Sequence, residues 1–135
     1  MSKIKILDLM RKKELVSRQS ASAVVGKLDA ELEKCQRVTN DIDEIAHQKS
    51  SISKKSDCYS FQSDRQLLLK LMEQKEILLN RQEFLYDEKQ SASDHLSKIQ
   101  KKIEYLESKR AQVEAETRSK RLAGWEDSQQ NKKKR

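Results

Sequence analysis

The feature that most constrains the fold is a seven-residue apolar repeat in the second half of the chain. Every seventh residue from position 71 to position 113 is apolar: Leu71, Leu78, Leu85, Ala92, Ile99, Leu106 and Val113. A strict seven-residue repeat places one apolar stripe on a helix and implies a left-handed supercoil with a second helix. The alternate positions of the stripe include Lys75, Gln82 and Lys89. Polar residues there weaken the helix contact but help to fix its register.

The first half of the chain has a helical spacing that is less regular. Mostly apolar residues keep steps of three and four in one phase and then in another: Leu7, Met10, Ser17, Ala21, Val24 and Leu28, followed by Leu32, Cys35, Val38, Ile42, Ile45 and Ile52. The shift of phase between residues 28 and 38 predicts a local change of the supercoil without an end to the helix. Gly26, just before the shift, predicts a weak point because Gly costs about 1 kcal/mol relative to Ala in a helix.

Two long helices with one turn fit the remaining composition. The 135 residues include no proline and two glycines, and 38% are charged, which is typical of long helices rather than of a compact domain with many corners. Serines and aspartates gather between Ser50 and Ser60, and these residue types favour caps and turns over helix interiors. Ser63 or Asp64 is the expected N-cap of the second helix.

These patterns predict an all-α fold in which two long helices form an antiparallel coiled-coil hairpin over residues 1–125. The expected segments are a helix over 4–50, a turn over 51–62 and a helix over 63–124. Residues 126–135 are expected to be a disordered basic tail, with Gly124 ending the second helix. A continuous helix in a parallel dimer is the alternative arrangement.

Basic side chains are concentrated at the two ends of the chain. Residues 1–20 hold 6 basic and 2 acidic side chains, residues 101–135 hold 11 and 6, and the middle carries −2. At ~1.5 Å per residue, the two helices are ~70 Å and ~90 Å long. A fold about residue 56 places Ile4 opposite Ser108, so the last turns of the second helix have no intrachain partner. Both basic ends then meet and form a pole of about +9.

The sequence carries no motif for catalysis or for binding a cofactor or metal. It lacks the glycine-rich loops that hold phosphate and the paired histidines that bind zinc, since His47 and His95 are isolated. Cys35 and Cys58 lie far apart and are expected to be reduced thiols. No apolar run reaches the ~18 residues of a membrane span, and the start resembles no signal peptide. We therefore expect a cytoplasmic protein that is not an enzyme.

Two surfaces are candidates for protein binding. The first is an apolar cluster wider than one helix stripe: Leu67, Leu68, Leu69, Leu71, Met72, Ile77, Leu78, Leu79, Phe84, Leu85 and Tyr86, with Tyr59, Phe61 and Arg65 beside it. The second is a stripe at helical spacing near the end of the chain: Ala111, Ala115, Arg118, Leu122 and Trp125. Aromatic and arginine side chains often anchor interfaces. Extra packing within the hairpin or with a second copy remains the alternative for the first, and a solvated helix end for the second.

The chain also resembles a known family. A short N-terminal segment ILDLMRKKE, a two-helix coiled coil, and a closing segment EAETRSKRLAGWEDSQQNKKKR are together similar to the FliJ family of flagellar and type III export proteins. The local elements are Ala115-Glu116 with Arg118, and Trp125-Glu126-Asp127 in place of the family's acidic and apolar ending. Gly124 departs from the family pattern.

The resemblance implies a stalk protein similar to the shaft of rotary ATPases. Family members place the paired ends of the coiled coil in the central hole of a hexameric export ATPase and contact a membrane export gate. The implied ATPase-binding residues are at the basic pole: Met10, Arg11, Lys12, Arg118, Lys120, Arg121, Leu122 and Trp125. The implied gate-binding residues lie early in the second helix: Phe61, Leu68, Met72 and Lys75. The membrane would be reached only through these partners.

Two other classes of function compete with the stalk hypothesis. A generic homodimeric scaffold would use the same coiled coil without an ATPase. A nucleic-acid-binding protein would use the basic pole to neutralise phosphates. Acidic residues are interleaved with the basic ones at Glu114, Glu116, Glu126 and Asp127, and no aromatic platform accompanies them. These features argue against a nucleic-acid partner.

Overall fold

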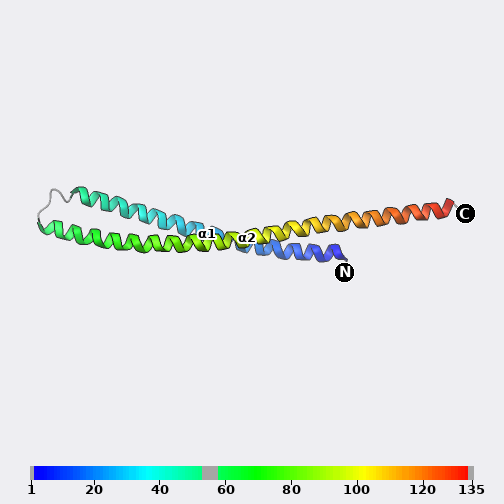
Figure 1. Cartoon of the computed structure of the whole chain (residues 1–135), viewed down its shortest axis with the longest axis horizontal. Coiled ribbons are helices and arrows are strands. Elements are labelled where there is room, and N and C mark those ends of the chain that lie inside the picture. Colours follow the sequence, from blue (N-terminus) through cyan, green and yellow to red (C-terminus); the bar gives the residue numbers. More distant parts are fainter. Residues whose placement is uncertain (1, 53–57, 134–135) are drawn as a thin grey trace. The chain divides into compact units, whose positions relative to one another are not determined.

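The fold is an all-α hairpin of two long helices, as predicted. In the computed structural model, α1 spans Lys3–Ile52 and α2 spans Cys58–Lys133 (Figure 1). The structure describes the backbone of residues 2–52 and 58–133 and the side chains of residues 2–50 and 61–130. Ser2 caps the start of α1, because its Oγ accepts a hydrogen bond from the Lys5 backbone N–H at 3.3 Å.

The predicted boundaries of α2 were wrong at both ends. The helix begins at Cys58, so Ser63 and Asp64 lie inside it rather than at an N-cap. Residues 51–52 and 58–62 of the predicted turn are helical, and residues 53–57 lie outside the described residues. The helix also continues through Gly124 to Lys133, where a disordered tail was expected from residue 126. Gly124 does not adopt the positive φ that would end a helix, and no proline follows it to stop the backbone hydrogen bonds.

Two compact units make up the chain. Unit 1 contains residues 1–22 and 94–135, and unit 2 contains residues 23–93. In each unit a stretch of α1 packs against a stretch of α2. The core of unit 1 is built from Ala21, Ile99 and Ile103, with Leu15 and Leu96 against them. The core of unit 2 is built from Leu32, Cys35 and Leu85, with Leu28 and Leu78 against them.

The predicted stripe of α2 faces α1 in both units, and we call the facing positions the seam. Every member of the seven-residue series from Leu71 to Val113 is buried or half-buried. The alternate positions are also withdrawn from solvent, with Ile103 at 1% exposure. The heptad prediction for α2 is therefore confirmed.

The predicted stripe of α1 was right in part, because six of its residues lie in the seam: Leu7, Ala21, Leu28, Leu32, Cys35 and Ile42. The predicted shift of phase was wrong, because the helix keeps one unbroken heptad phase, and the side chain of Ile52 falls outside the described ones. Its buried and half-buried seam positions follow steps of three and four throughout: Ile4, Leu7, Arg11, Glu14, Arg18, Ala21, Val25, Leu28, Leu32, Cys35, Thr39, Ile42, Ala46 and Lys49. Met10, Val24, Val38 and Ile45, which were placed in the stripe, are exposed at its edge. Some seam positions are polar, and their side chains form hydrogen bonds or ion pairs. Thr39, for example, is buried and donates its hydroxyl to the Cys35 carbonyl at 2.8 Å.

The register of the hairpin differs by several residues from the prediction. In unit 1, Asp8 pairs with Arg110 at 2.7 Å and Arg11 with Glu107 at 3.0 Å. Ile4 therefore lies near the level of Val113 rather than Ser108. Fewer residues of α2 therefore lie beyond the level of Ile4 than the sequence predicted. In that unit, the end of α2 still extends past the N-terminal end of α1 (Figure 1).

Candidate partner-binding surfaces

The end of α2 in unit 1 packs against no other helix among the residues that the structure describes. We call residues 118–133 the terminal segment. All of its described side chains, residues 118–130, are exposed, and the last half-buried seam position is Thr117. Leu122 is 61% exposed and Trp125 is 62% exposed. The segment holds five basic and two acidic residues, so it combines a net positive charge with two large apolar side chains in water.

The predicted stripe from Ala111 to Trp125 lies on the side of α2 that faces away from α1. Val113 and Thr117 face the seam, whereas Ala111 and Ala115 are exposed. Arg118, Leu122 and Trp125 continue the outward face at steps of four and three. A partner could therefore approach this stripe without displacing α1.

The predicted ATPase-binding residues all lie in unit 1, but they do not form one surface. Arg118, Lys120, Arg121, Leu122 and Trp125 are exposed on the terminal segment. On α1, Arg11 is a seam residue whose Nε donates a hydrogen bond to Glu107 Oε1 at 3.0 Å. Met10 and Lys12 are exposed on the two flanks of that position. Arg11 therefore links α1 to α2 within the hairpin.

The predicted gate-binding residues lie on α2 in unit 2 and divide into two kinds. Phe61 and Met72 are exposed, at 49% and 56%. Leu68 is a half-buried seam residue, and Lys75 pairs with Asp43 at 2.6 Å. Only Phe61 and Met72 are free of the seam and available to a partner. Tyr59 falls outside the described side chains.

One side of the seam in unit 2 is closed by polar pairs, and we call it the polar side. Three polar residues of α2 each meet a polar residue of α1: Lys75 with Asp43 at 2.6 Å, Gln82 with Gln36 at 3.4 Å, and Lys89 with Asp29 at 2.6 Å. Asp29 raises the pKa of the Lys89 ammonium above its ordinary value, first through the hydrogen bond it accepts and then through charge attraction. The three predicted polar seam positions of α2 are thus satisfied.

Unit 1 has a polar side of the same kind. Asp8 pairs with Arg110 at 2.7 Å, and Arg18 donates a hydrogen bond from Nη1 to Gln100 Oε1 at 3.1 Å. Arg110 also pairs with Glu114, four residues along the same helix, at 3.2 Å. The acidic groups near the seam of unit 1 therefore form their ion pairs mainly on this side.

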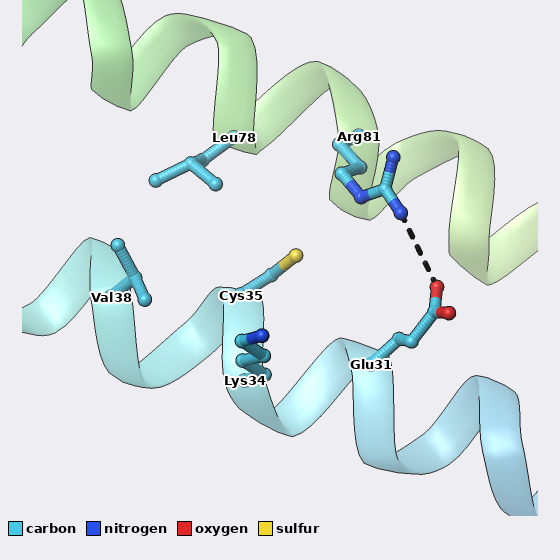
Figure 2. A pocket seen from close by; sticks show the side chains of 6 residues that line it. All are labelled: Glu31, Lys34, Cys35, Val38, Leu78 and Arg81. Carbon is cyan, nitrogen blue, oxygen red and sulfur yellow. Dashed lines mark hydrogen bonds and ion pairs between the residues drawn. The ribbon is translucent and has the colours of Figure 1, made fainter.

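The opposite side of the seam, which we call the apolar side, contains a groove in unit 2. Its lining residues come from both helices: Glu31, Lys34, Cys35, Val38, Leu78 and Arg81. Figure 2 shows Leu78 above Val38 and Cys35, with Arg81 reaching Glu31 across one end. That ion pair measures 3.4 Å. The Cys35 thiol is free and buried beneath the groove.

Unit 1 has its own groove on the apolar side. It is lined by Met10, Lys13, Glu14, Lys102, Tyr105 and Leu106. Leu106 is buried at 5% exposure, whereas Met10 and Tyr105 are 48% and 65% exposed. The floor is thus the seam itself, and the walls combine apolar and basic side chains.

Sequence reasoning missed both grooves. Each groove is formed by residues of two helices, and its position depends on the register between them. A signal existed in α1, where Met10, Val24, Val38 and Ile45 repeat at multiples of seven. That pattern marks the edge of the seam rather than the seam. The apolar cluster of α2 is wider than the seam, as predicted, because Leu69, Ile77 and Phe84 lie outside the seam and are 59%, 59% and 60% exposed.

The described residues offer surfaces rather than enclosed sites. Among them, no three His, Cys, Asp or Glu side chains gather to hold a metal ion. None of the described helical stretches is apolar enough over a sufficient length to cross a bilayer. The fold and its surfaces define a helical hairpin of the antiparallel coiled-coil class. No protein-family model, curated protein or solved structure matches the chain.

Proposed function

We propose that the chain is a non-enzymatic coiled-coil stalk or coupling protein of a bacterial flagellar, or type III, export apparatus. In this role it links a hexameric export ATPase to the membrane export gate, works in the cytoplasm, and reaches the membrane only through its partners. The observation that carries the proposal is the terminal segment, an exposed basic helix with Leu122 and Trp125 on its surface. The resemblance to the FliJ family supplies the identity of the partners.

The terminal segment suits insertion into a ring of subunits better than binding to a flat surface. Its described side chains are exposed, so a partner could surround it on all sides. A large apolar side chain such as Trp125 can contribute about 2 kcal/mol when a partner buries it, and basic side chains steer an acidic partner toward it. Arg118, Lys120 and Arg121 supply that charge.

The ATPase contact is tested by two double variants with nearly equal exposure. Leu122→Ala with Trp125→Ala removes side chains that are 61% and 62% exposed, and Ile77→Ala with Phe84→Ala removes side chains that are 59% and 60% exposed in unit 2. We expect the first variant to bind a purified hexameric export ATPase at least about tenfold more weakly. It should also lose any effect on ATP turnover. The second variant should behave as wild type, and equal behaviour of the two variants would refute the proposal.

The gate contact is proposed for the exposed pair Phe61 and Met72. Leu68 and Lys75 serve the seam of unit 2, so their substitution would disturb the hairpin and give an ambiguous result. We expect Phe61→Ala with Met72→Ala to reduce capture by the cytoplasmic domain of an export gate protein. Ile6→Ala with Leu9→Ala, which removes side chains of 45% and 54% exposure in unit 1, is the control and should leave capture unchanged.

A homodimeric scaffold is the second candidate, and one observation favours it. Unit 2 exposes several large apolar side chains, among them Val38 and Ile45 on α1 and Ile77 and Phe84 on α2. Exposed apolar surface of this kind often marks an interface. Sedimentation of the full chain at increasing concentration distinguishes the stalk protein from the scaffold. A stable dimer that does not bind the ATPase would favour the scaffold.

A further inference from the structure

The groove on the apolar side of unit 1 has the composition of a binding site for a third helix. Its floor is the buried Leu106, and the exposed Met10 and Tyr105 stand on its two walls. A groove between two paired helices follows their axes, so an occupant that fills it must also be elongated. An amphipathic helix with an apolar stripe is the segment that packs in this way.

Lysines surround this groove. Lys13 and Lys102 line it. Lys98 and Lys109 are exposed on the same face of α2, four residues before Lys102 and four after Tyr105. Within the residues that the structure describes, none of these four lysines lies within ion-pairing distance of an acidic group. Their charges are therefore available to a partner.

The polar side explains why these lysines lack acidic neighbours. Unit 1 has only two acidic residues on α1, Asp8 and Glu14. Asp8 forms an ion pair with Arg110, and Glu107 of α2 forms an ion pair with Arg11. Glu14 lines the groove as its single acidic residue. The two sides of the same seam are thus unequal in charge, one internally neutralised and the other basic.

We propose that the groove of unit 1 binds a partner helix whose apolar stripe is bordered by acidic side chains. The stripe packs on Met10, Tyr105 and Leu106, and the acidic borders pair with Lys13 and Lys102. The result is a short three-helix coiled coil. The site is separate from the terminal segment, and the inference holds whether or not the chain binds an export ATPase.

The experiment uses two synthetic peptides and the full chain. Each peptide is about four heptads long with Leu at the two seam positions of each heptad, and the borders are Glu in one peptide and Lys in the other. Fluorescence anisotropy measures binding of each peptide to the full chain. We expect the Glu peptide to bind at least about tenfold more tightly than the Lys peptide, with a difference that shrinks as salt is added.

Matched charge reversals locate the binding. Lys13→Glu with Lys102→Glu changes the groove, whereas Lys5→Glu with Lys101→Glu makes the same charge change at exposed positions of the same helices. We expect the first pair to weaken binding of the Glu peptide roughly tenfold or more and the second less than about threefold. Equal losses would show diffuse attraction to a basic surface and overturn the proposal.

A second pair of variants tests the apolar walls. Met10→Ser with Tyr105→Ser should also reduce peptide binding, whereas Leu9→Ser with Val16→Ser, at exposed positions of 54% and 66%, should not. All four side chains are exposed, so circular dichroism should show the hairpin intact in both variants. Unchanged binding after loss of Met10 and Tyr105 would overturn the proposal. Self-association of the full chain that the groove variants abolish would also overturn it, because a second copy would then be the occupant.

Discussion

Two stretches of α2 within unit 1 show how differently one helix can use the same kinds of residue. Residues 94–117 bury Ile99, Ile103 and Leu106 against α1, and their polar seam residue Arg110 meets Asp8. The terminal segment has apolar residues too, but Leu122 and Trp125 are exposed, and no described residue of α1 lies opposite them. The first stretch is explained by the hairpin. The second leaves its apolar side chains in water, where the proposed ATPase contact would bury them.

The two stretches should differ most in how the truncation of an apolar side chain changes the free energy of unfolding. Ile103→Ala removes the most buried side chain of the core, at 1% exposure, and should cost about 3 kcal/mol in the free energy of unfolding. Leu122→Ala should change it by less than about 0.5 kcal/mol because that side chain is already in water. Urea unfolding followed by circular dichroism measures both. If Ile103→Ala does not fold, Ile103→Val should still cost about 1 kcal/mol, and equal effects at positions 103 and 122 would contradict the comparison.

The two glycines give a smaller and more selective test. Both lie inside helices without positive φ, and neither has an atom within 4 Å of an added Cβ. Gly26→Ala in the paired part of unit 2 should raise the free energy of unfolding by up to about 1 kcal/mol. Gly124→Ala should raise helix content instead, with little change in the unfolding midpoint, because the described side chains of the terminal segment are all exposed. A shift of the midpoint by Gly124→Ala alone would show that the terminal segment is packed.

The seam of α1 was harder to predict from the sequence than the seam of α2. The seam of α2 was predictable because its series from Leu71 to Val113 is apolar without a gap. The seam of α1 was predictable only in part, because Met10, Val24 and Val38 also repeat at multiples of seven and compete with the true seam, which contains Arg11 and Thr39. The polar residues are accepted because Glu107 and the Cys35 carbonyl satisfy them. The register depends on which residues of the two helices pair across the seam, and the apolar pattern of α1 alone does not determine it.

The candidate surfaces divide in the same way. Leu122 and Trp125 could be predicted as exposed because they lie in the part of the second helix that the unequal helix lengths leave unpaired. Both grooves could not, since each needs residues from two helices in the correct register. Gly124 misled the prediction of a tail because a glycine can end a helix or continue one. Nothing nearby in the sequence distinguishes the two.

Exchange of a seam ion pair tests whether the polar side sets the register. Lys75→Asp places two acids together in unit 2, where Lys75 and Asp43 are now 2.6 Å apart, and should destabilise the hairpin by up to about 1 kcal/mol. Addition of Asp43→Lys should recover most of that loss, because the pair is restored with reversed polarity. Thermal unfolding of the two single variants and the double variant measures the coupling. No recovery in the double variant would show that the pair does not contribute.

The smallest expected effect is the alkaline titration of Lys89. Asp29 raises the pKa of Lys89 above the ordinary 10.5, so the folded state holds this proton more tightly than the unfolded state does. The pair therefore stabilises the hairpin fully below pH 10.5, and its contribution is lost as the pH rises through the higher pKa of the folded state. Wild type should have a higher unfolding midpoint than Asp29→Asn at neutral pH, and the gap should narrow above pH 10.5. Asp87→Asn removes an exposed carboxylate that has no ion pair among the described residues, and its gap to wild type should stay constant because no lysine is paired with it. A gap for Asp29→Asn that does not change with pH would mean that the stabilisation by Asp29 is independent of the Lys89 proton.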